Sequence, residues 1–223
     1  MIYLDNAASS HPKPQGVYDA VAEALKTGAN PGRSGHALAL DASRFILSAR
    51  EGGASIVGAP SASRIIFTSN ATHALNQALQ GFLEKGDHVV SSAMEHNSVL
   101  RPLHALERLG INHTLIGADE EGIIDVERVA EAITPQTRLV ALTHASNVTG
   151  ALLDIERIGD LCRERGVKFL LDASQSLGAY PLDVVASGVD MLAAPGHKGL
   201  LGPQGTGILY VGEGGGSTSL HSG

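Results

Sequence analysis

The chain has 223 residues, of which 43% are hydrophobic and 17% charged, a composition typical of a folded globular protein. The net charge is -7 without a basic cluster, which argues against nucleic acid or an anionic membrane as a partner. A single cysteine precludes an internal disulfide, and neither a signal peptide nor a membrane-spanning run is recognisable, so we expect a soluble, cytoplasmic protein.

The first two regular patterns along the chain predict helices. Apolar residues recur at helical spacing over Gln15–Thr27 and again over Leu38–Val57, with a turn-rich loop between them. Pro60 and the small residues around it end the second helix. We expect this helix to bury its larger side chains and Ala49, namely Leu40, Phe45, Ile46, Leu47, Ala49 and Ile56.

From residue 64 to residue 211, short apolar runs alternate with helical patterns. The predicted strands are Arg64–Thr68, His88–Ser91, His113–Ile116, Leu139–Thr143, Phe169–Asp172, Met191–Ala193 and Gly207–Val211. The predicted helices are Thr72–Glu84, Ser98–Leu109, Val126–Ile133 and Ile155–Arg165. Continuous apolar runs are typical of parallel strands covered by helices on both faces. We therefore predict an α/β protein, three-layered α/β/α, with a mostly parallel mixed sheet of about seven strands. The last strand follows its predecessor without room for a helix, so we expect one antiparallel strand.

Ligands of open α/β sheets gather at the carboxyl ends of the strands, so polar residues there are site candidates. Ala71 and Thr72 begin a helix directly after a strand, where backbone N–H groups bind phosphate. The commoner use of such a segment is N-capping, here by Ser69, Asn70 or Thr72.

Three further strand ends carry polar residues. His96 suits stacking on a flat ring or proton transfer, and Asn147 suits donation to a phenolic oxygen, although both residue types are ordinary in loops. Asp172 closes an apolar strand and therefore needs a partner, for which a protonated pyridine nitrogen qualifies. Gln175, three residues later, is placed to reach an oxygen on the same ring.

Lys198 follows His197 in the glycine-rich turn Ala194–Pro203. Such a lysine either extends its ammonium group to water or uses its amine chemically, above all to form an imine with pyridoxal 5'-phosphate (PLP). The glycines of Gly202–Gly207 precede a strand and not a helix, which argues against a nicotinamide-binding fingerprint. No metal ligands are assigned.

Six motifs together resemble the class V group of fold-type I PLP enzymes, and within it the cysteine desulfurases and selenocysteine lyases. In chain order they are Tyr3–Ala8, Thr68–Thr72, Glu95–Pro102, Ser146–Gly150, Asp172–Gln175, and His197–Lys198 followed by Gly202–Gly207.

The resemblance implies that Lys198 bonds PLP covalently and shuttles the substrate α-proton, that Asp172 pairs with the pyridinium nitrogen, and that His96 stacks on the ring. Gln175 and Asn147 are then expected at the ring hydroxyl. The phosphate ligands implied by the resemblance are Ala71, Thr72 and His197. We expect an N-terminal segment at 1–30 and a PLP-binding large domain at 31–211. The Gly/Ser-rich composition of residues 212–223 predicts a flexible tail.

The chain departs from the desulfurase pattern at several positions. Pro195 stands where a phosphate-binding serine is usual, Asn70 replaces a glycine and His73 a glutamate. The resemblance also implies a missing C-terminal small domain, which in the family supplies the nucleophilic cysteine and the arginine that binds the substrate carboxylate. The one cysteine, Cys162, lies on a predicted helix among apolar residues, so we expect it to be buried and structural.

Three functional hypotheses follow. The first is a desulfurase-like enzyme that converts cysteine or selenocysteine to alanine and passes sulfur or selenium to an acceptor protein. The second is a class V aminotransferase or another PLP lyase. The third is a truncated domain that binds PLP without turnover. The family resemblance also implies a homodimer.

Overall fold

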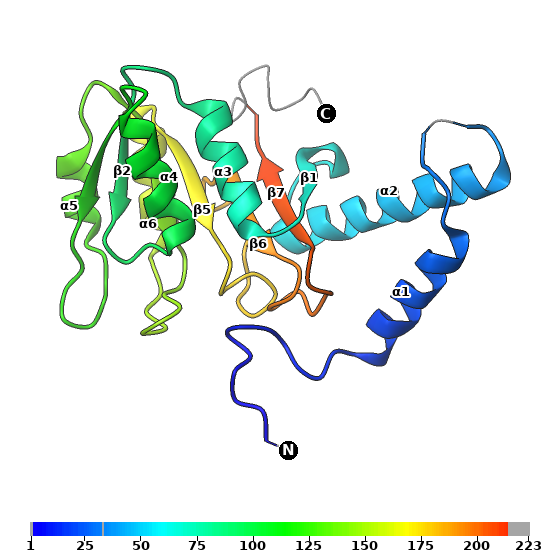
Figure 1. The fold of residues 1–223 in the computed structure, drawn as a ribbon. Helices are drawn as coiled ribbons and strands as arrows, with labels where there is room; N and C mark the ends of the chain where they lie inside the picture. The colour runs from blue at the N-terminus through cyan, green and yellow to red at the C-terminus, as the bar shows by residue number, and fades with distance from the viewer. Residues whose placement is uncertain (1, 33, 214–223) are drawn as a thin grey trace.

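The computed structural model describes residues 2–32 and 34–213. Seven strands form one mixed sheet in the order β1-β7-β6-β5-β4-β2-β3 (Figure 1). They are β1 (Ile65–Thr68), β2 (His88–Ser92), β3 (Asn112–Ile116), β4 (Thr137–Thr143), β5 (Lys168–Asp172), β6 (Met191–Pro195) and β7 (Gly207–Val211). Strands β2 to β6 pair in parallel, while β7 runs antiparallel to both β1 and β6. The predicted mostly parallel sheet with one reversed strand is confirmed.

Helices cover both faces of this sheet. One face packs against α3 (Ala71–Phe82) and α4 (Asn97–Glu107), and the other against α5 (Val126–Ala132) and α6 (Ile155–Arg165). Successive residues of β2 show the alternation: Val89 joins the core under α3 and α4, and Val90 joins the core under α5 and α6. Both valines are fully buried, as are the neighbouring β4 residues, which explains why the strands read as continuous apolar runs.

Helices α1 (Gln15–Thr27) and α2 (Ala37–Val57) project beyond the edge of the sheet (Figure 1). Only the last turns of α2 reach the body, where Val57 is buried with Ile65. The expectation that α2 buries its large apolar residues is wrong: Leu40, Phe45, Ile46, Leu47 and Ile56 are between 37% and 52% exposed. These side chains stay exposed because most of α2 extends beyond the sheet, where only α1 packs beside it among the described residues.

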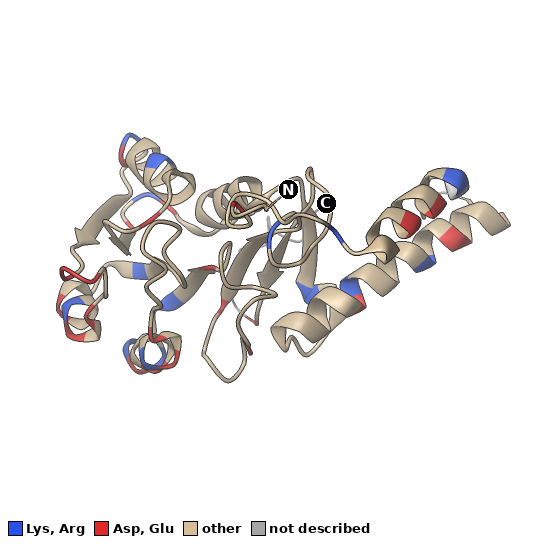
Figure 2. Cartoon of the chain, turned by 90° about the horizontal axis from the view of Figure 1, so that it is seen from below, with Lys and Arg blue, Asp and Glu red and all other residues tan. Residues whose placement is uncertain are grey.

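Charged residues lie mainly on the outer helices and loops, where both signs are interspersed (Figure 2). Within residues 2–32 and 34–213, every helix is too short or too polar to span a lipid bilayer. The predicted tail at 212–223 lies, apart from its first two residues, outside the described part of the chain.

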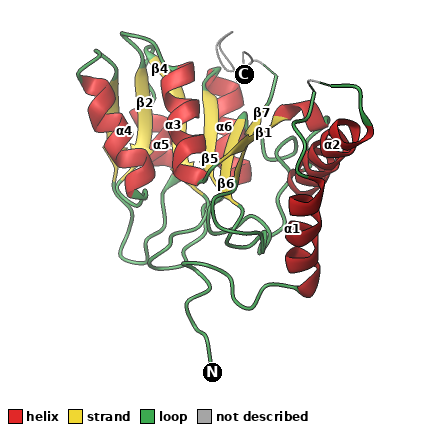
Figure 3. Cartoon of the chain, turned by 45° about the vertical axis from the view of Figure 1, so that its right-hand side comes forward, coloured by secondary structure: helices red, strands yellow, loops and turns green. Residues whose placement is uncertain are grey.

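The carboxyl ends of β1, β2, β4, β5 and β6 meet at one edge, since β1 and β6 run the same way on either side of the reversed β7. The loops that follow these strands gather there, beside the N-terminal segment (Figure 3). Ala194 and Pro195, expected in a turn, instead extend β6, because Pro195 pairs with Gly207 of β7. The turn that carries Lys198 therefore starts at Gly196, whose N–H donates to the Thr206 carbonyl (2.8 Å).

Candidate functional site

A cavity of about 460 Å3 opens at this edge of the sheet. It is lined by all eight residues that the sequence analysis selected: Ala71, Thr72, His96, Asn147, Asp172, Gln175, His197 and Lys198. These residues come from five loops that follow five different strands. The structure thus brings the selected residues together, while their chemical roles remain predictions.

Asp172 ends β5 at the floor of the cavity and is 3% exposed. Its Oδ1 accepts a hydrogen bond from the Ser174 N–H (2.9 Å). Burial raises the pKa of the Asp172 carboxyl above its ordinary value, while the Ser174 hydrogen bond, His96 and Lys198 oppose the rise. A carboxylate in this position is stabilised by any cation that enters the cavity.

Lys198 also lines the cavity and is half-buried, in the turn after β6. Burial lowers the pKa of its amine, and the charge of Asp172 acts in the other direction. A lowered pKa increases the share of uncharged amine, which is the nucleophilic form.

The turn that carries Lys198 is fixed by a close crossing of two backbone segments. A Cβ placed on Gly199 would lie 2.3 Å from the Leu177 carbonyl oxygen, and one placed on Gly178 would lie 2.4 Å from the Gly199 carbonyl oxygen. Gly178 also has a φ of 86°, which favours glycine. Side chains are thus excluded at both positions, and the lysine turn packs directly on the loop that follows Asp172.

A chain of hydroxyl and imidazole groups joins two of the selected residues. The Thr72 hydroxyl lies 2.9 Å from the Ser98 hydroxyl, which lies 2.6 Å from His96 Nδ1. The Ser98 N–H also donates to this nitrogen (3.1 Å), so His96 is the N-cap of α4. An acceptor role for Nδ1 places the proton of the neutral ring on Nε2. Ser98, which also lines the cavity, escaped the sequence analysis.

The first turn of α3 faces the same cavity. Its N-cap is Asn70, whose side chain accepts the His73 N–H (2.8 Å), so the capping interpretation holds for Asn70. The N–H groups of Ala71 and Thr72 precede the first intrahelical bond and are available to an anion. The departures at Asn70 and His73 therefore form part of the helix cap and leave the backbone donors in place.

The N-terminal segment closes one side of the cavity. Asp5, Ala7 and Ala8 line it, although the sequence analysis gave this motif no role beyond family resemblance. The Ser10 N–H and hydroxyl both donate to the His197 carbonyl (2.9 and 3.0 Å). These two hydrogen bonds hold the N-terminal segment to the residue next to Lys198. The only sign of this in the sequence was the motif Tyr3–Ala8, to which no function was assigned.

Gln175 and Asn147 lie at the cavity mouth. The Gln175 amide donates to the Ala7 carbonyl (3.3 Å), which ties the loop after β5 to the N-terminal segment. Asn147 is exposed and lines the cavity from the loop after β4. His197, which is expected to bind phosphate, has a buried Nδ1 without a hydrogen-bond partner among the described residues, and burial, Lys198 and Lys13 lower the pKa of this imidazole.

A buried acid lies behind the cavity wall. Glu95 is 6% exposed, and its Oε1 accepts from the Ser92 hydroxyl (2.5 Å) and the Thr143 N–H (3.0 Å). In the part of the chain that the structure describes, Oε2 has no hydrogen-bond partner. Burial raises the pKa of Glu95 to about 8, with a further contribution from the negative charge of Asp172. A protonated Glu95 adds no charge that competes with Asp172.

Cys162 lies on α6 in the core and is 1% exposed, as expected. Burial raises the pKa of its thiol to about 12, with a smaller effect from Asp190. The thiolate, which is the nucleophilic form, is therefore strongly disfavoured at Cys162.

A model of the family described as aminotransferase class-V matches residues 2–216. Among curated proteins, the chain is 42% identical over 94% of its length to a probable cysteine desulfurase from Methanothermobacter thermautotrophicus. It is 36% identical to the cysteine desulfurase IscS of Neisseria meningitidis, again over 94% of its length. The chain spans about half of these relatives, 52% in each case.

Two solved structures have the same fold over 95% of the chain. A cysteine desulfurase from Thermococcus onnurineus in its apo form superimposes with a TM-score of 0.89 at 35% identity, and the chain covers 54% of it. SspA in complex with cysteine superimposes with a TM-score of 0.88 at 36% identity, and the chain covers 61% of it.

Proposed function

The chain belongs to the aminotransferase class-V family, and from this we propose that it forms the PLP-binding part of an enzyme of the cysteine desulfurase type. The single observation that carries the proposal is the cavity that Lys198 and Asp172 share with the first turn of α3. The Lys198 amine suits an aldehyde, the Asp172 carboxyl suits a pyridine nitrogen, and the first turn of α3 suits a phosphate. PLP carries all three of these groups in one molecule.

The residues present fit this cofactor on electrostatic grounds. Asp172 is a buried carboxyl whose pKa is raised for want of a cation, and a protonated ring nitrogen supplies one. The buried His197 Nδ1 has no partner within the described residues, and a phosphate oxygen would provide one. Pro195 brings no donor to the phosphate side, so we assign phosphate binding to Ala71, Thr72 and His197.

When bound, PLP acts as an electron sink that stabilises negative charge at the substrate α-carbon. Asp172 keeps the ring nitrogen protonated, and His96, oriented through its Nδ1 by Ser98, covers the ring. Lys198 holds the cofactor through its amine and afterwards moves the proton at the substrate α-carbon. Gln175 and Asn147 orient the ring hydroxyl.

We propose a small amino acid as the substrate, cysteine first and selenocysteine second. The support is that the curated relatives are named cysteine desulfurases and that one structural neighbour is a complex with cysteine. The thiol that takes the sulfur is not Cys162, which is buried with a strongly raised pKa. It must come from outside these 223 residues, and an acceptor protein would receive the sulfur afterwards.

The same observation on Cys162 favours a second candidate, a chain that binds PLP and exchanges the α-proton but transfers no sulfur by itself. We also propose a homodimer, because the apolar side chains exposed on α2 are suited to burial against a second copy. We also propose that the protein is located in the cytoplasm and that its domain limits are 1–30, 31–211 and 212–223.

The test is borohydride reduction of the chain loaded with PLP, followed by peptide mapping. We expect the cofactor on the peptide that contains Lys198, a loss of labelling in Lys198→Ala, and normal labelling in the control Lys85→Ala, an exposed loop lysine. Labelling of another lysine in the unmodified chain would refute the assignment. Assays for alanine with sulfide, or for pyruvate, then separate desulfurase from aminotransferase, and α-proton exchange without either product identifies the second candidate.

A further inference from the structure

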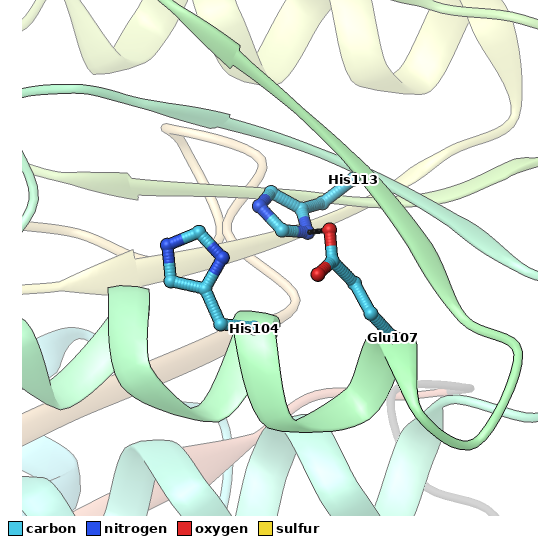
Figure 4. A group of neighbouring side chains, drawn as sticks. All are labelled: His104, Glu107 and His113. Atoms are coloured by element: carbon cyan, nitrogen blue, oxygen red, sulfur yellow. Dashed lines mark ion pairs between the residues drawn. The ribbon is translucent and has the colours of Figure 1, made fainter.

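A second cluster of ligand-type side chains lies far from the cavity edge, at the other end of α4. His104 and Glu107 come from the last turn of this helix, and His113 comes from the edge strand β3 (Figure 4). One nitrogen or oxygen from each residue lies within 4.8 Å of those from the other two. None of the three lines the cavity described above.

The local fold explains the convergence. His104 and Glu107 are three residues apart, so they lie on the same side of α4. The turn after α4 returns the chain to β3, where the Ile111 N–H donates to the Leu106 carbonyl (3.2 Å). Ile116 packs in the core on the far face of the sheet, and the alternation of a strand therefore turns His113 toward α4.

The geometry between His113 and Glu107 is that of two ligands. His113 Nδ1 and Glu107 Oε1 are 3.3 Å apart, and the His113 side chain is only 6% exposed. Within residues 2–32 and 34–213, this buried nitrogen nevertheless has no hydrogen-bond partner. Two ligand atoms on a tetrahedral ion with bonds of about 2.0–2.1 Å are separated by roughly 3.3–3.5 Å, which matches the observed spacing.

His104 completes the set. Its ring meets that of His113 edge to face, with centroids 4.9 Å apart and an angle of 65° between the planes. His104 is exposed, so its side chain is free to rotate and close the remaining gap.

We propose that His104, Glu107 and His113 bind one divalent transition-metal ion, for which Zn2+ is the best match. Two imidazoles and one carboxylate favour Zn2+ over Mg2+ or Ca2+, which prefer oxygen ligands. Three protein ligands leave a fourth position for water. An ion held here ties the end of α4 to β3, and thereby fixes the helix that begins at His96.

The experiment titrates the chelator-treated, PLP-loaded chain with Zn2+ by calorimetry, and with Co2+ by visible absorption. We expect one equivalent of Zn2+, and intense Co2+ bands of a four-coordinate site. His104→Ala and Glu107→Gln each weaken Zn2+ binding at least tenfold; both side chains are exposed, so these variants should fold. The controls His11→Ala and Glu131→Gln, which change a histidine and a glutamate outside the cluster, bind like the unmodified chain.

Two results would overturn the proposal. One is Zn2+ binding that is the same in the unmodified chain and in the double variant His104→Ala, Glu107→Gln. The other is binding that the control variants weaken as much as the cluster variants do, which would place the ion elsewhere. Since the PLP content is measured separately, failure of the cofactor assignment is distinguishable from failure of the metal site.

Discussion

Replacing Glu95 with glutamine is predicted to change how the stability of the protein depends on pH. Glu95 has an ordinary pKa of 4.5 in the unfolded chain and about 8 in the folded one. Between these values the unfolded chain has released the proton and the folded chain has kept it. The free energy of unfolding therefore has its full Glu95 contribution below pH 4.5 and loses it as the pH rises toward 8.

The size of the effect follows from the two pKa values. Each pH unit in this window removes up to about 1.4 kcal/mol, so that between pH 5 and pH 7 Glu95 costs the unmodified protein roughly 2–3 kcal/mol. Glutamine has the shape of the protonated acid and retains an oxygen for the Ser92 hydroxyl and the Thr143 N–H. Glutamine does not titrate, so Glu95→Gln removes the Glu95 contribution to the pH dependence of the unfolding free energy and leaves the contributions of all other groups.

The assay is urea denaturation of both proteins at pH 5, 6 and 7, with Glu84→Gln as an exposed control. The difference in unfolding free energy between Glu95→Gln and the unmodified protein is expected to move by roughly 2–3 kcal/mol in favour of the variant from pH 5 to pH 7. A difference that stays constant within about 0.5 kcal/mol would refute the buried, protonated state of Glu95.

Three further predictions concern the site and its support. Asp172→Ala is expected to weaken PLP binding at least tenfold and nearly abolish exchange of the alanine α-proton, measured by NMR in deuterated water; unchanged exchange contradicts the pairing with the ring nitrogen. Gly199→Ala places a Cβ against the Leu177 carbonyl and is expected to lower the free energy of unfolding by about 1–3 kcal/mol, whereas Gly52→Ala, in open space on α2, raises it by about 0.5–1 kcal/mol; equal denaturation midpoints would speak against the crossing. A thiol reagent at pH 8 is expected to label Cys162 only after denaturation, as followed by mass spectrometry, and rapid labelling of the native chain would exclude its burial.

Much of the fold could be predicted from the sequence, because the strands carry their own signal. Buried parallel strands such as β4 and β5 must be apolar on both faces, and helices such as α6 must show one apolar side, so local composition is enough to place them. The reversal of β7 was also predictable, since the few residues after β6 leave no length for a crossover helix.

The predictions that were wrong concern segments whose structure depends on elements distant in the sequence, which no local pattern encodes. Apolar residues recur at helical spacing along α2, yet most of α2 lies where no layer covers it. Pro195 looks like a turn residue, but the partner strand β7 extends β6 through it.

The selected site residues could be identified because parallel strands bring their carboxyl ends to one edge of the sheet. Polar residues at the predicted strand ends are therefore the candidates. Asp5 and Ala7 were missed because they follow no strand, and Ser98 was missed because it lies in the first turn of α4, where a serine is ordinary. His104, Glu107 and His113 were missed because their meeting depends on which side of β3 faces α4.

The pairing of Ile65 with Tyr210 has a consequence for how the protein matures. One wall of the cavity begins just after β1, at Asn70, and it is joined to the wall that carries Lys198 when β7 lies between β1 and β6. Contacts so distant in sequence form late during folding, after most of the chain has left the ribosome. Capture of the cofactor is therefore expected to follow the insertion of β7, because a nascent chain that stops before β7 carries the binding residues without the strand that joins the two walls.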